Sequence, residues 1–351
     1  MGIIRLLLAT SVVLFHSGIP SGYNIANSTV AVLSFFIISG FYMAFILDKK
    51  YKGPGSSLLF ISNRFLRIFP LYWTILLITL GFVFLKLYFH LGSEDNAIIH
   101  YLRYSPNLLS PAFYKDLINL IIRNITLILS LDYFRVNNSQ PGYLLIPQAW
   151  TLQLELLFYL LVPFIMKMSK KIFIVFLLIY LVGFFGFIVP NQLIPPTLTF
   201  AFLSNLLFFL LGVISYRFIF NFYNTKKIKP LISKMLFVSF LAYLIFYNLI
   251  PTKFPILALN IDDFPYYLLL IFALPAIFIQ TSSNAADNFI GKLSYPVYIT
   301  HLFIVKLLSN LGLNSTWLVT STLVLFITLY VSYLAIKFID NPIDNFRQSR
   351  L

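Results

Sequence analysis

The sequence has no cysteine among its 351 residues, and it has few charges for its length. Without a thiol the chain can form neither a disulfide, nor a cysteine thioester, nor a cysteine metal site. Charged residues make up only 10% of the sequence, with 11 Asp and Glu against 25 Lys and Arg. Apolar residues fill the chain instead: 60% are hydrophobic and 18% are aromatic. This composition is typical of a protein that crosses a membrane several times.

The net charge of +14 does not indicate nucleic-acid binding, because Lys and Arg are scattered between the hydrophobic runs. Most of them lie at span ends that fall on one side, which places both termini in the cytoplasm. We expect an all-α bundle that forms one integral-membrane domain over residues 1–351, with no appended soluble domain. The predicted spans, about ten, are 3–19, 28–47, 68–89, 150–166, 172–189, 199–220, 231–250, 265–281, 290–309 and 316–338.

A further apolar segment, residues 117–131, is short and carries Arg123 and Asn124 in its middle. If it crossed the membrane, every later loop would change sides, and the basic clusters at 167–171 and 226–234 would lie outside. We therefore predict that 117–131 forms a re-entrant or interfacial helix within one long outer loop.

The first apolar run carries two ionisable residues, Arg5 and His16. Eleven residues make almost three helical turns, so both side chains project from one face, roughly 16 Å apart along the axis. Ionisable residues inside a membrane are costly and usually face a bundle interior or a wet cavity. We predict that this face lines a polar track from Arg5 to His16. The alternative is that the two residues only anchor the helix ends at the membrane surfaces.

Two arginines, Arg64 and Arg67, stand at the cytoplasmic entry to the third predicted span. Three residues apart, they share a helix face, and paired guanidinium groups can bind phosphate through parallel hydrogen bonds. An ordinary anchor on the positive, cytoplasmic side is the alternative.

Gln148, Thr151, Glu155 and Tyr159 form a polar stripe on one face of the next span. Glu155 is the only acidic residue inside a clear span, and its depth is close to that of His16. A carboxylate beside an imidazole raises its basicity and selects its tautomer, as a general base requires. The alternative is a structural hydrogen bond from Glu155 to the backbone or to a tyrosine.

A second intramembrane histidine, His301, follows Ser294 on the same helix face. Both a catalytic role and a hydrogen bond between helices are open for it. No Walker A, GxSxG or HExxH motif occurs, and we expect no metal.

Six groups of residues, in this order, resemble the acyltransferase-3 family of membrane-bound O-acyltransferases over nearly the whole chain. They are Arg5-x10-His16, Ser34–Phe41, Arg64-x-x-Arg67 with Pro70–Trp73, Trp150–Glu155 with Tyr159 and Pro163, Ser294–Tyr298 with His301, and Asp340–Pro342.

The resemblance implies transfer of an acyl group, usually acetyl from cytoplasmic acetyl-CoA, to a hydroxyl of a surface glycan or of a lipid-linked glycan precursor. It implies His16 as the catalytic residue, and we place Glu155 beside it. The residues that would bind the acyl-CoA donor are Arg5, Arg64 and Arg67. Candidates for acceptor binding or for lining the pore are Ser39, Trp150, Tyr159, Ser294 and His301.

The resemblance also implies a bacterial-type inner or plasma membrane, with membrane lipid around the bundle and no nucleic-acid partner. His16 could deprotonate the acceptor hydroxyl or take the acyl group itself, and the sequence leaves both open. Two alternatives remain: a flippase or transporter for a lipid-linked glycan, and the same fold using a succinyl or longer acyl donor. Inverted repeats and paired broken helices, which secondary transporters commonly show, are not visible.

Overall fold

The computed structural model describes residues 1–23, 25–89, 118, 121–127, 144–188, 198–226, 229–250, 253–256, 259–313 and 316–350. These residues are almost entirely helical, and the chain divides into two compact units. Unit 1 comprises Met1–Gly53 and Leu207–Pro342, and unit 2 comprises Pro54–Leu206 and Ile343–Arg350. The prediction of a helical protein is confirmed, and that of a single domain stays a prediction.

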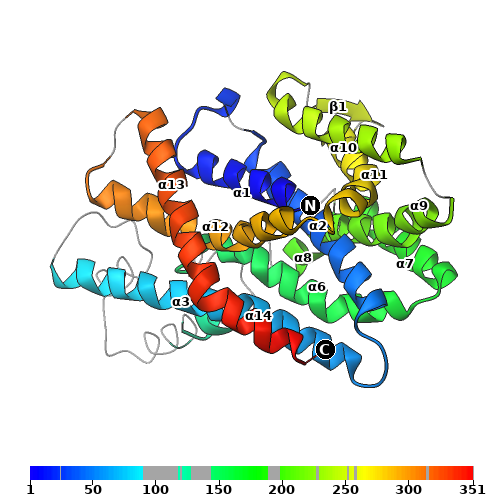
Figure 1. Cartoon of the computed structure of the whole chain (residues 1–351), viewed down its shortest axis with the longest axis horizontal. Helices are drawn as coiled ribbons and strands as arrows, with labels where there is room; N and C mark the ends of the chain where they lie inside the picture. Colours follow the sequence, from blue (N-terminus) through cyan, green and yellow to red (C-terminus); the bar gives the residue numbers. More distant parts are fainter. Residues whose placement is uncertain are drawn as a thin grey trace. The chain divides into compact units, whose positions relative to one another are not determined.

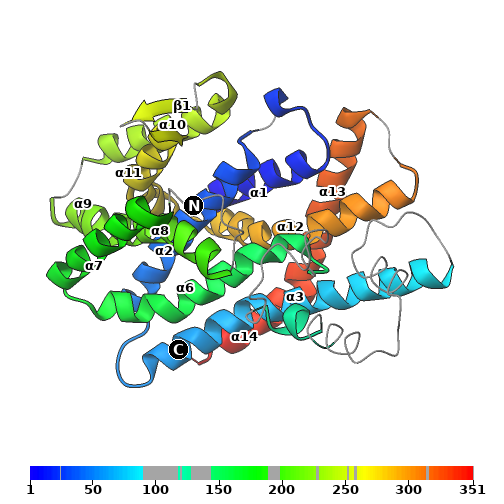
Figure 2. The same ribbon diagram turned by 180° about the vertical axis from the view of Figure 1, so that it is seen from behind.

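Unit 1 begins with two apolar helices and ends with the helices that pack on them. Its elements are α1 (Gly2–His16), η1 (Ser21–Tyr23), α2 (Ser28–Lys49), the second half of α8 (Leu198–Ile214), η4 (Ser215–Phe220), α9 (Asn221–Lys226), α10 (Pro230–Ile245), η5 (Tyr247–Leu249), β1 (Lys253–Ile256), β2 (Leu259–Asp262), α11 (Phe264–Thr281), α12 (Ala285–Asn310), α13 (Trp317–Ala335) and η6 (Ile336–Asp340). The two strands form a short antiparallel hairpin between α10 and α11, which pack together (Figure 2).

Unit 2 is built around one long helix, α3 (Ser56–Tyr88), which continues through Pro70. Its other elements are η2 (Pro147–Ala149), α6 (Trp150–Lys167), α7 (Lys170–Gly183), η3 (Phe184–Ile188), the start of α8, and nearly all of α14 (Asn341–Gln348). In both views α14 lies beside α3 (Figures 1 and 2).

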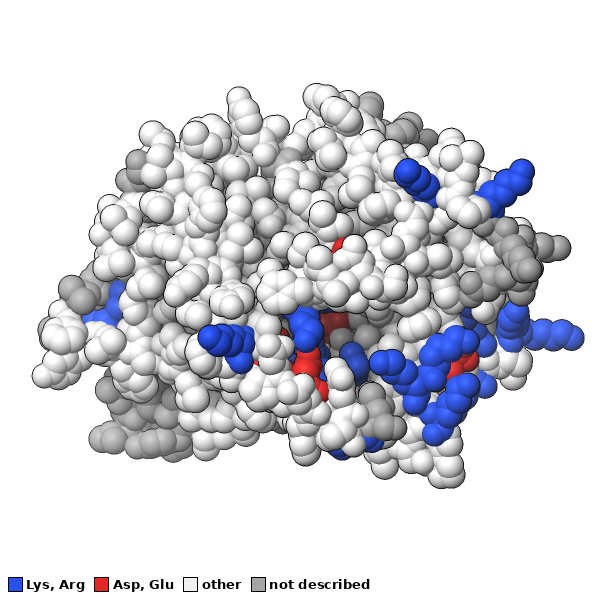
Figure 3. Space-filling view, in the orientation of Figure 1, with Lys and Arg blue, Asp and Glu red and all other residues white. Residues whose placement is uncertain are grey.

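Each of the ten predicted spans falls on a helix, and seven helical segments in the described part of the chain are long and apolar enough to cross a membrane. Of the other three, α1 and α10 are shorter, and α12 has 26 residues but carries Lys292 and Lys306. Apolar side chains also dominate the exposed surface, so the face drawn in Figure 3 is mostly uncharged. The chain is therefore an integral membrane protein, while the count of ten spans stays a prediction.

Glycines let α1 and α12 approach until their backbones touch. A Cβ added to Gly291 would lie 2.9 Å from the Cα of Gly2, and one added to Gly2 would lie 2.6 Å from the Gly291 nitrogen. Small residues allow such close crossings inside membranes. His16 lies beside His301 at the other end of the pair, so the two helices run in the same direction.

A second glycine crossing joins α2 to α8. A Cβ on Gly40 would lie 2.0 Å from the Phe209 carbonyl oxygen, and one on Gly212 would lie 2.0 Å from that of Ile37. Further along, Asp48 of α2 accepts a hydrogen bond from the hydroxyl of Tyr216 in η4, which continues α8, so α2 and α8 also run in the same direction. When ten spans alternate in direction, the first and ninth spans (α1 and α12) are parallel, and so are the second and sixth (α2 and α8). An extra crossing at 117–131 would reverse α8 and α12 and make both pairs antiparallel.

Only residues 118 and 121–127 of the predicted re-entrant segment are described, and the remainder of 117–131 lies outside the described residues. Residues 121–126 are helical and pack on α3, where the Tyr72 hydroxyl donates to the Asn124 carbonyl at 2.6 Å and the Trp73 indole donates to the Ile125 carbonyl at 2.9 Å. The re-entrant path itself stays a prediction.

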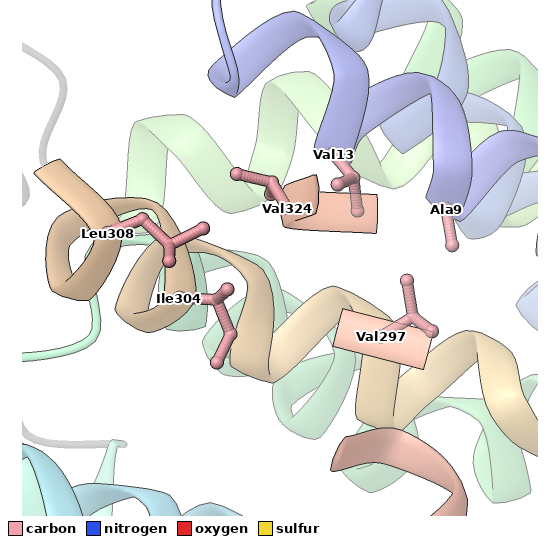
Figure 4. Packing of buried hydrophobic residues seen from close by; sticks show 6 residues of the cluster. All are labelled: Ala9, Val13, Val297, Ile304, Leu308 and Val324. Carbon is pink, nitrogen blue, oxygen red and sulfur yellow. The ribbon is translucent and has the colours of Figure 1, made fainter. Parts of the chain in front are cut away.

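An apolar cluster holds α1 against α12 and α13 (Figure 4). From Ala9 and Val13 on α1 it extends to Val297, Ile304 and Leu308 on α12 and to Val324 on α13. Along α1 and α12 these side chains are spaced by four or seven residues, which places them on one face of each helix. The cluster thus sets the rotation of α1 and α12 near their two histidines.

Candidate functional site

His16 is the last residue of α1, and its side chain is exposed. The helix ends there because the chain turns at Ser17 and Gly18, and Gly18 has a φ of +87°, which favours glycine. The Ser321 hydroxyl of α13 donates to the Ser17 carbonyl at 3.3 Å. A neighbouring helix therefore holds the end of α1 on which His16 stands.

His301 of α12 stands next to His16 but is completely buried. The centroids of the two imidazole rings are 5.3 Å apart, and the ring planes are inclined by 35°. Nδ1 of His301 lies 2.7 Å from the carbonyl oxygen of Tyr298, one helical turn earlier. Its other nitrogen, Nε2, has no hydrogen-bond partner in the described part of the chain. An exposed imidazole backed by a buried one can accept and release a proton at the surface of the bundle.

The opposite end of α1 is fixed by a carboxylate. Asp287, in the first turn of α12, accepts hydrogen bonds from the backbone N–H groups of Gly2 at 2.7 Å and Ile3 at 2.9 Å, and its Oδ2 lies 2.6 Å from the Met1 amino group. That amino group also contacts the Thr281 hydroxyl. A negative charge is favourable at a helix N-terminus. Burial alone would raise the pKa of Asp287, but these hydrogen bonds outweigh it and hold the pKa below its ordinary value.

Arg5 lies near this carboxylate end, half-buried, whereas His16 stands at the other end of the same helix. Lys292 of α12, one to two turns after Asp287, donates to the Asn341 side chain at 3.3 Å.

All three predicted acceptor or pore residues in unit 1, namely Ser39, Ser294 and His301, are buried. The Ser294 hydroxyl donates to the Gly291 carbonyl of its own helix at 2.8 Å, so it satisfies a backbone group near the glycine crossing. Ser39 is buried on α2, one residue before Gly40. Of these three residues in unit 1, His301 is the one that lies beside His16.

The remaining predicted site residues belong to unit 2. Glu155 is half-buried in the second turn of α6, and Trp150 begins that helix. Tyr159 is buried and makes an edge contact with Phe60 of α3, with ring centroids 6.1 Å apart. Because His16 lies in unit 1, its expected pairing with Glu155 stays a prediction.

Arg64 and Arg67 have different surroundings on α3. The guanidinium of Arg64 lies 5.6 Å from the centre of the Phe60 ring, and its Nε is buried without a hydrogen-bond partner in the described residues. Nη1 of Arg67 lies 3.6 Å from Oδ1 of Asp344, a residue of α14. Of the two arginines, Arg67 is the one that an ion pair joins to α14 within the described residues.

The sequence pattern did not indicate that α14 and the residues just after it add arginines to this region. Arg347 lies 3.3 Å from Asp344, and Arg350 donates to the Asn63 and Ser62 side chains at 3.0 and 2.9 Å. Arg350 also borders a shallow depression of about 540 Å³ next to α3, lined otherwise by Leu58, Leu59, Ile61, Ser62 and Phe65. The sequence shows a basic C-terminal tail, which could have indicated further arginines at this site. The tail contacts α3 across almost 300 residues of chain, so the contact cannot be predicted from neighbouring residues.

No group of three or more His, Asp or Glu that could hold a metal ion occurs within the described ranges. The expectation of a metal-free reaction stays a prediction. The chemistry that the described residues offer is proton transfer or nucleophilic attack by imidazole, together with anion binding by arginine.

Comparison with known proteins yields one finding. A family model described as an acyltransferase domain, that of acyltransferase-3, matches residues 1–337. No curated protein and no solved structure matches the chain.

Proposed function

The chain belongs to the acyltransferase-3 family and is a membrane acyltransferase, and from this premise we propose that it moves an acetyl group from acetyl-CoA to a hydroxyl of a cell-surface glycan or of a lipid-linked glycan precursor. The observation that supports the proposal best is His16, an exposed imidazole at the end of α1 with the buried His301 behind it. Such an imidazole can do the proton chemistry that acyl transfer to a hydroxyl needs.

In the first form of the reaction, neutral His16 takes the proton of the acceptor hydroxyl. The hydroxyl oxygen then attacks the thioester carbonyl, a C–O bond forms and the C–S bond breaks. The CoA thiolate leaves and takes the proton from His16, which returns to its neutral form. The products are an O-acyl ester and free CoA, with no oxidant or metal required.

In the second form, a nitrogen of His16 attacks the thioester carbonyl. An N–C bond forms, the C–S bond breaks and CoA leaves as the thiol after taking up the proton that His16 loses. The acceptor hydroxyl then attacks the acyl-imidazole, and its proton returns to the freed imidazole. Both forms use the same residue, and they differ in whether the enzyme carries the acyl group.

Donor binding is assigned to Arg5, Arg64 and Arg67. Arg64 supports this role because its guanidinium makes neither an ion pair nor a hydrogen bond within the described residues, and it rests only on the Phe60 ring. Guanidinium groups suit phosphate better than ammonium groups do, because they offer two donors in a fixed fork. Glu155, in the polar stripe of α6, is assigned to raising the basicity of His16 through its negative charge.

We place the enzyme in a bacterial-type plasma membrane with both termini in the cytoplasm, so that the arginines face the cytoplasmic donor. His16, about 16 Å further along α1 by helix geometry, then lies near the outer leaflet, where a glycan acceptor would be presented.

The test is an acyl-transfer assay with purified protein in lipid vesicles and acetyl-CoA labelled in the acetyl group. The wild-type protein should release CoA and label a hydroxyl acceptor, and His16→Ala should lower that rate by about 10²–10⁴-fold, the range typical of a lost general base. CoA binding by His16→Ala, measured by calorimetry, controls for folding.

Two outcomes separate the alternatives. Label that stays on the wild-type protein without acceptor, and is absent from His16→Ala, favours the acyl-imidazole form. Failure of the wild type to use acetyl-, succinyl- or longer acyl-CoA, together with translocation of a lipid-linked glycan, would refute the proposal and favour a flippase.

A further inference from the structure

We infer that His301 acts as the hydrogen-bond acceptor that orients His16, so that the two form a His–His dyad in which only His16 meets the substrates. The inference rests on the proposed function, which assigns the reaction to His16, and it adds a positioning residue with a specific tautomer.

The tautomer of His301 follows from its hydrogen bond to the backbone. Nδ1 lies 2.7 Å from the Tyr298 carbonyl oxygen, which can only accept a hydrogen bond. Nδ1 must therefore carry the proton. A neutral imidazole has a single N–H, so Nε2 of His301 presents a lone pair and can only accept.

That lone pair has no donor within the described residues, although the His301 side chain is completely buried. Buried polar atoms in native proteins are nearly always hydrogen-bonded, because burial removes the water that would otherwise bind them. An orphaned buried acceptor is therefore expected to find a donor when the site is occupied or rearranged.

His16 is well placed to be that donor. Its ring centroid is 5.3 Å from that of His301, and a rotation of the exposed His16 side chain can turn one of its N–H groups toward Nε2. Hydrogen bonds between catalytic groups are often long before substrate binds and tighten in the complex. The apolar cluster of α1, α12 and α13, together with the hydrogen bond from Ser321 to Ser17, keeps the two helix segments from separating.

The consequence for His16 is directional. When one ring N–H of His16 donates to His301, the other ring nitrogen is unprotonated and points away from the buried histidine. That second nitrogen is the base or nucleophile that the proposed reaction needs. His301 would then serve the function that a carboxylate serves in other catalytic dyads, but without a buried negative charge, which is costly inside a membrane.

The experiment compares two substitutions that keep different parts of the imidazole. His301→Asn keeps a polar group near the Nδ1 position, whereas His301→Gln places an amide oxygen near the Nε2 position, where it can accept from His16. The control is Thr300→Val, because the buried Thr300 hydroxyl donates to Pro296 of its own helix at 2.8 Å and belongs to the same turn.

The first readout is the ¹⁵N spectrum of histidine-labelled protein in nanodiscs, which distinguishes protonated from unprotonated ring nitrogens. The chain has four histidines, so the His16 signals are assigned by their loss in His16→Ala. Wild type, Thr300→Val and His301→Gln should show one His16 tautomer, and His301→Asn should show a mixture. This readout does not depend on the reaction, so it tests the dyad even if the protein proves inactive toward acyl-CoA.

The second readout is the rate of acyl transfer. His301→Asn should lower kcat by at least about 100-fold with little change in KM for the donor, and His301→Gln should recover at least about tenfold of that loss. An unchanged His16 tautomer in His301→Asn, or a folded His301→Asn protein with kcat within about threefold of wild type, overturns the dyad. If both variants lose kcat equally and His301→Asn shows an altered His16 tautomer, the dyad is still supported, because the loss of the acceptor on His301 is what changes that tautomer.

Discussion

The glycine crossing of α1 and α12 offers a stringent test, because it connects helix packing to the geometry of the histidines. In Gly291→Ala the new Cβ would lie 2.9 Å from the Cα of Gly2, whereas an ordinary contact needs 3.4–4 Å. The helices must therefore separate by roughly 0.5–1 Å at this point, because a backbone atom cannot rotate away as a side chain can. Overpacking of this kind costs about 1–3 kcal/mol.

The site should also respond, although it lies ten residues further along α12. Displacing a catalytic group by about 1 Å can cost on the order of 100-fold in rate. Since the helices can pivot about the apolar cluster, only part of the shift reaches His301, and we expect kcat for acyl transfer to fall about tenfold.

Gly81→Ala on α3 is the matched control, because no described residue has an atom within 4 Å of its added Cβ. There alanine should be neutral, or stabilising by up to about 1 kcal/mol, since it suits a helix better than glycine does. The assays are thermal unfolding of both variants in the same detergent and acyl transfer in vesicles. If the free energies of unfolding of Gly291→Ala and Gly81→Ala differ by less than about 0.5 kcal/mol, roughly the scatter of surface substitutions, the close backbone contact is not what holds α1 to α12.

Three further predictions concern the donor site, the acidic end of α1 and the topology. Arg67→Lys should weaken CoA binding measured by calorimetry while thermal stability stays near wild type, because charge remains but the two-donor fork is lost; unchanged affinity in the folded double variant Arg64→Ala, Arg67→Ala would return both residues to the role of anchors. The pKa of Asp287 is depressed from 3.8, so its contribution to stability is full above that value and is lost as pH falls through the folded pKa. Asp287→Asn should therefore lower the free energy of unfolding by about 1.5–3 kcal/mol at pH 7 and by less as the pH falls below 3.8, and a loss that does not change with pH would count against the ionised carboxylate. A reporter fused near Arg135, which lies outside the described residues, should be extracytoplasmic and one near Lys170 cytoplasmic, whereas the same side for both would show that 117–131 does not return to the outside.

Several features of the protein could be predicted from local sequence because they depend on neighbouring residues alone. Hydrophobic runs with few charges can satisfy their backbone groups in a bilayer only as helices, which predicts the all-helical membrane protein. Helical periodicity likewise places Arg5 and His16 on one face of α1, and Arg64 beside Arg67 on α3. The order of six motifs predicts the acyltransferase-3 family, which the family match over residues 1–337 confirms.

What only the tertiary structure decided is which helix faces meet. His301 was open to both a catalytic and a structural reading, and its place next to His16 follows from the packing of two helices that are almost 300 residues apart in the chain. The contact of Arg350 with Ser62 and Asn63 could not be read from a basic tail for the same reason. Periodicity specifies a face of each helix but not its neighbour, because the neighbour is chosen by shape: a glycine pair that allows backbone contact and an apolar cluster that sets the rotation of α1 against α12.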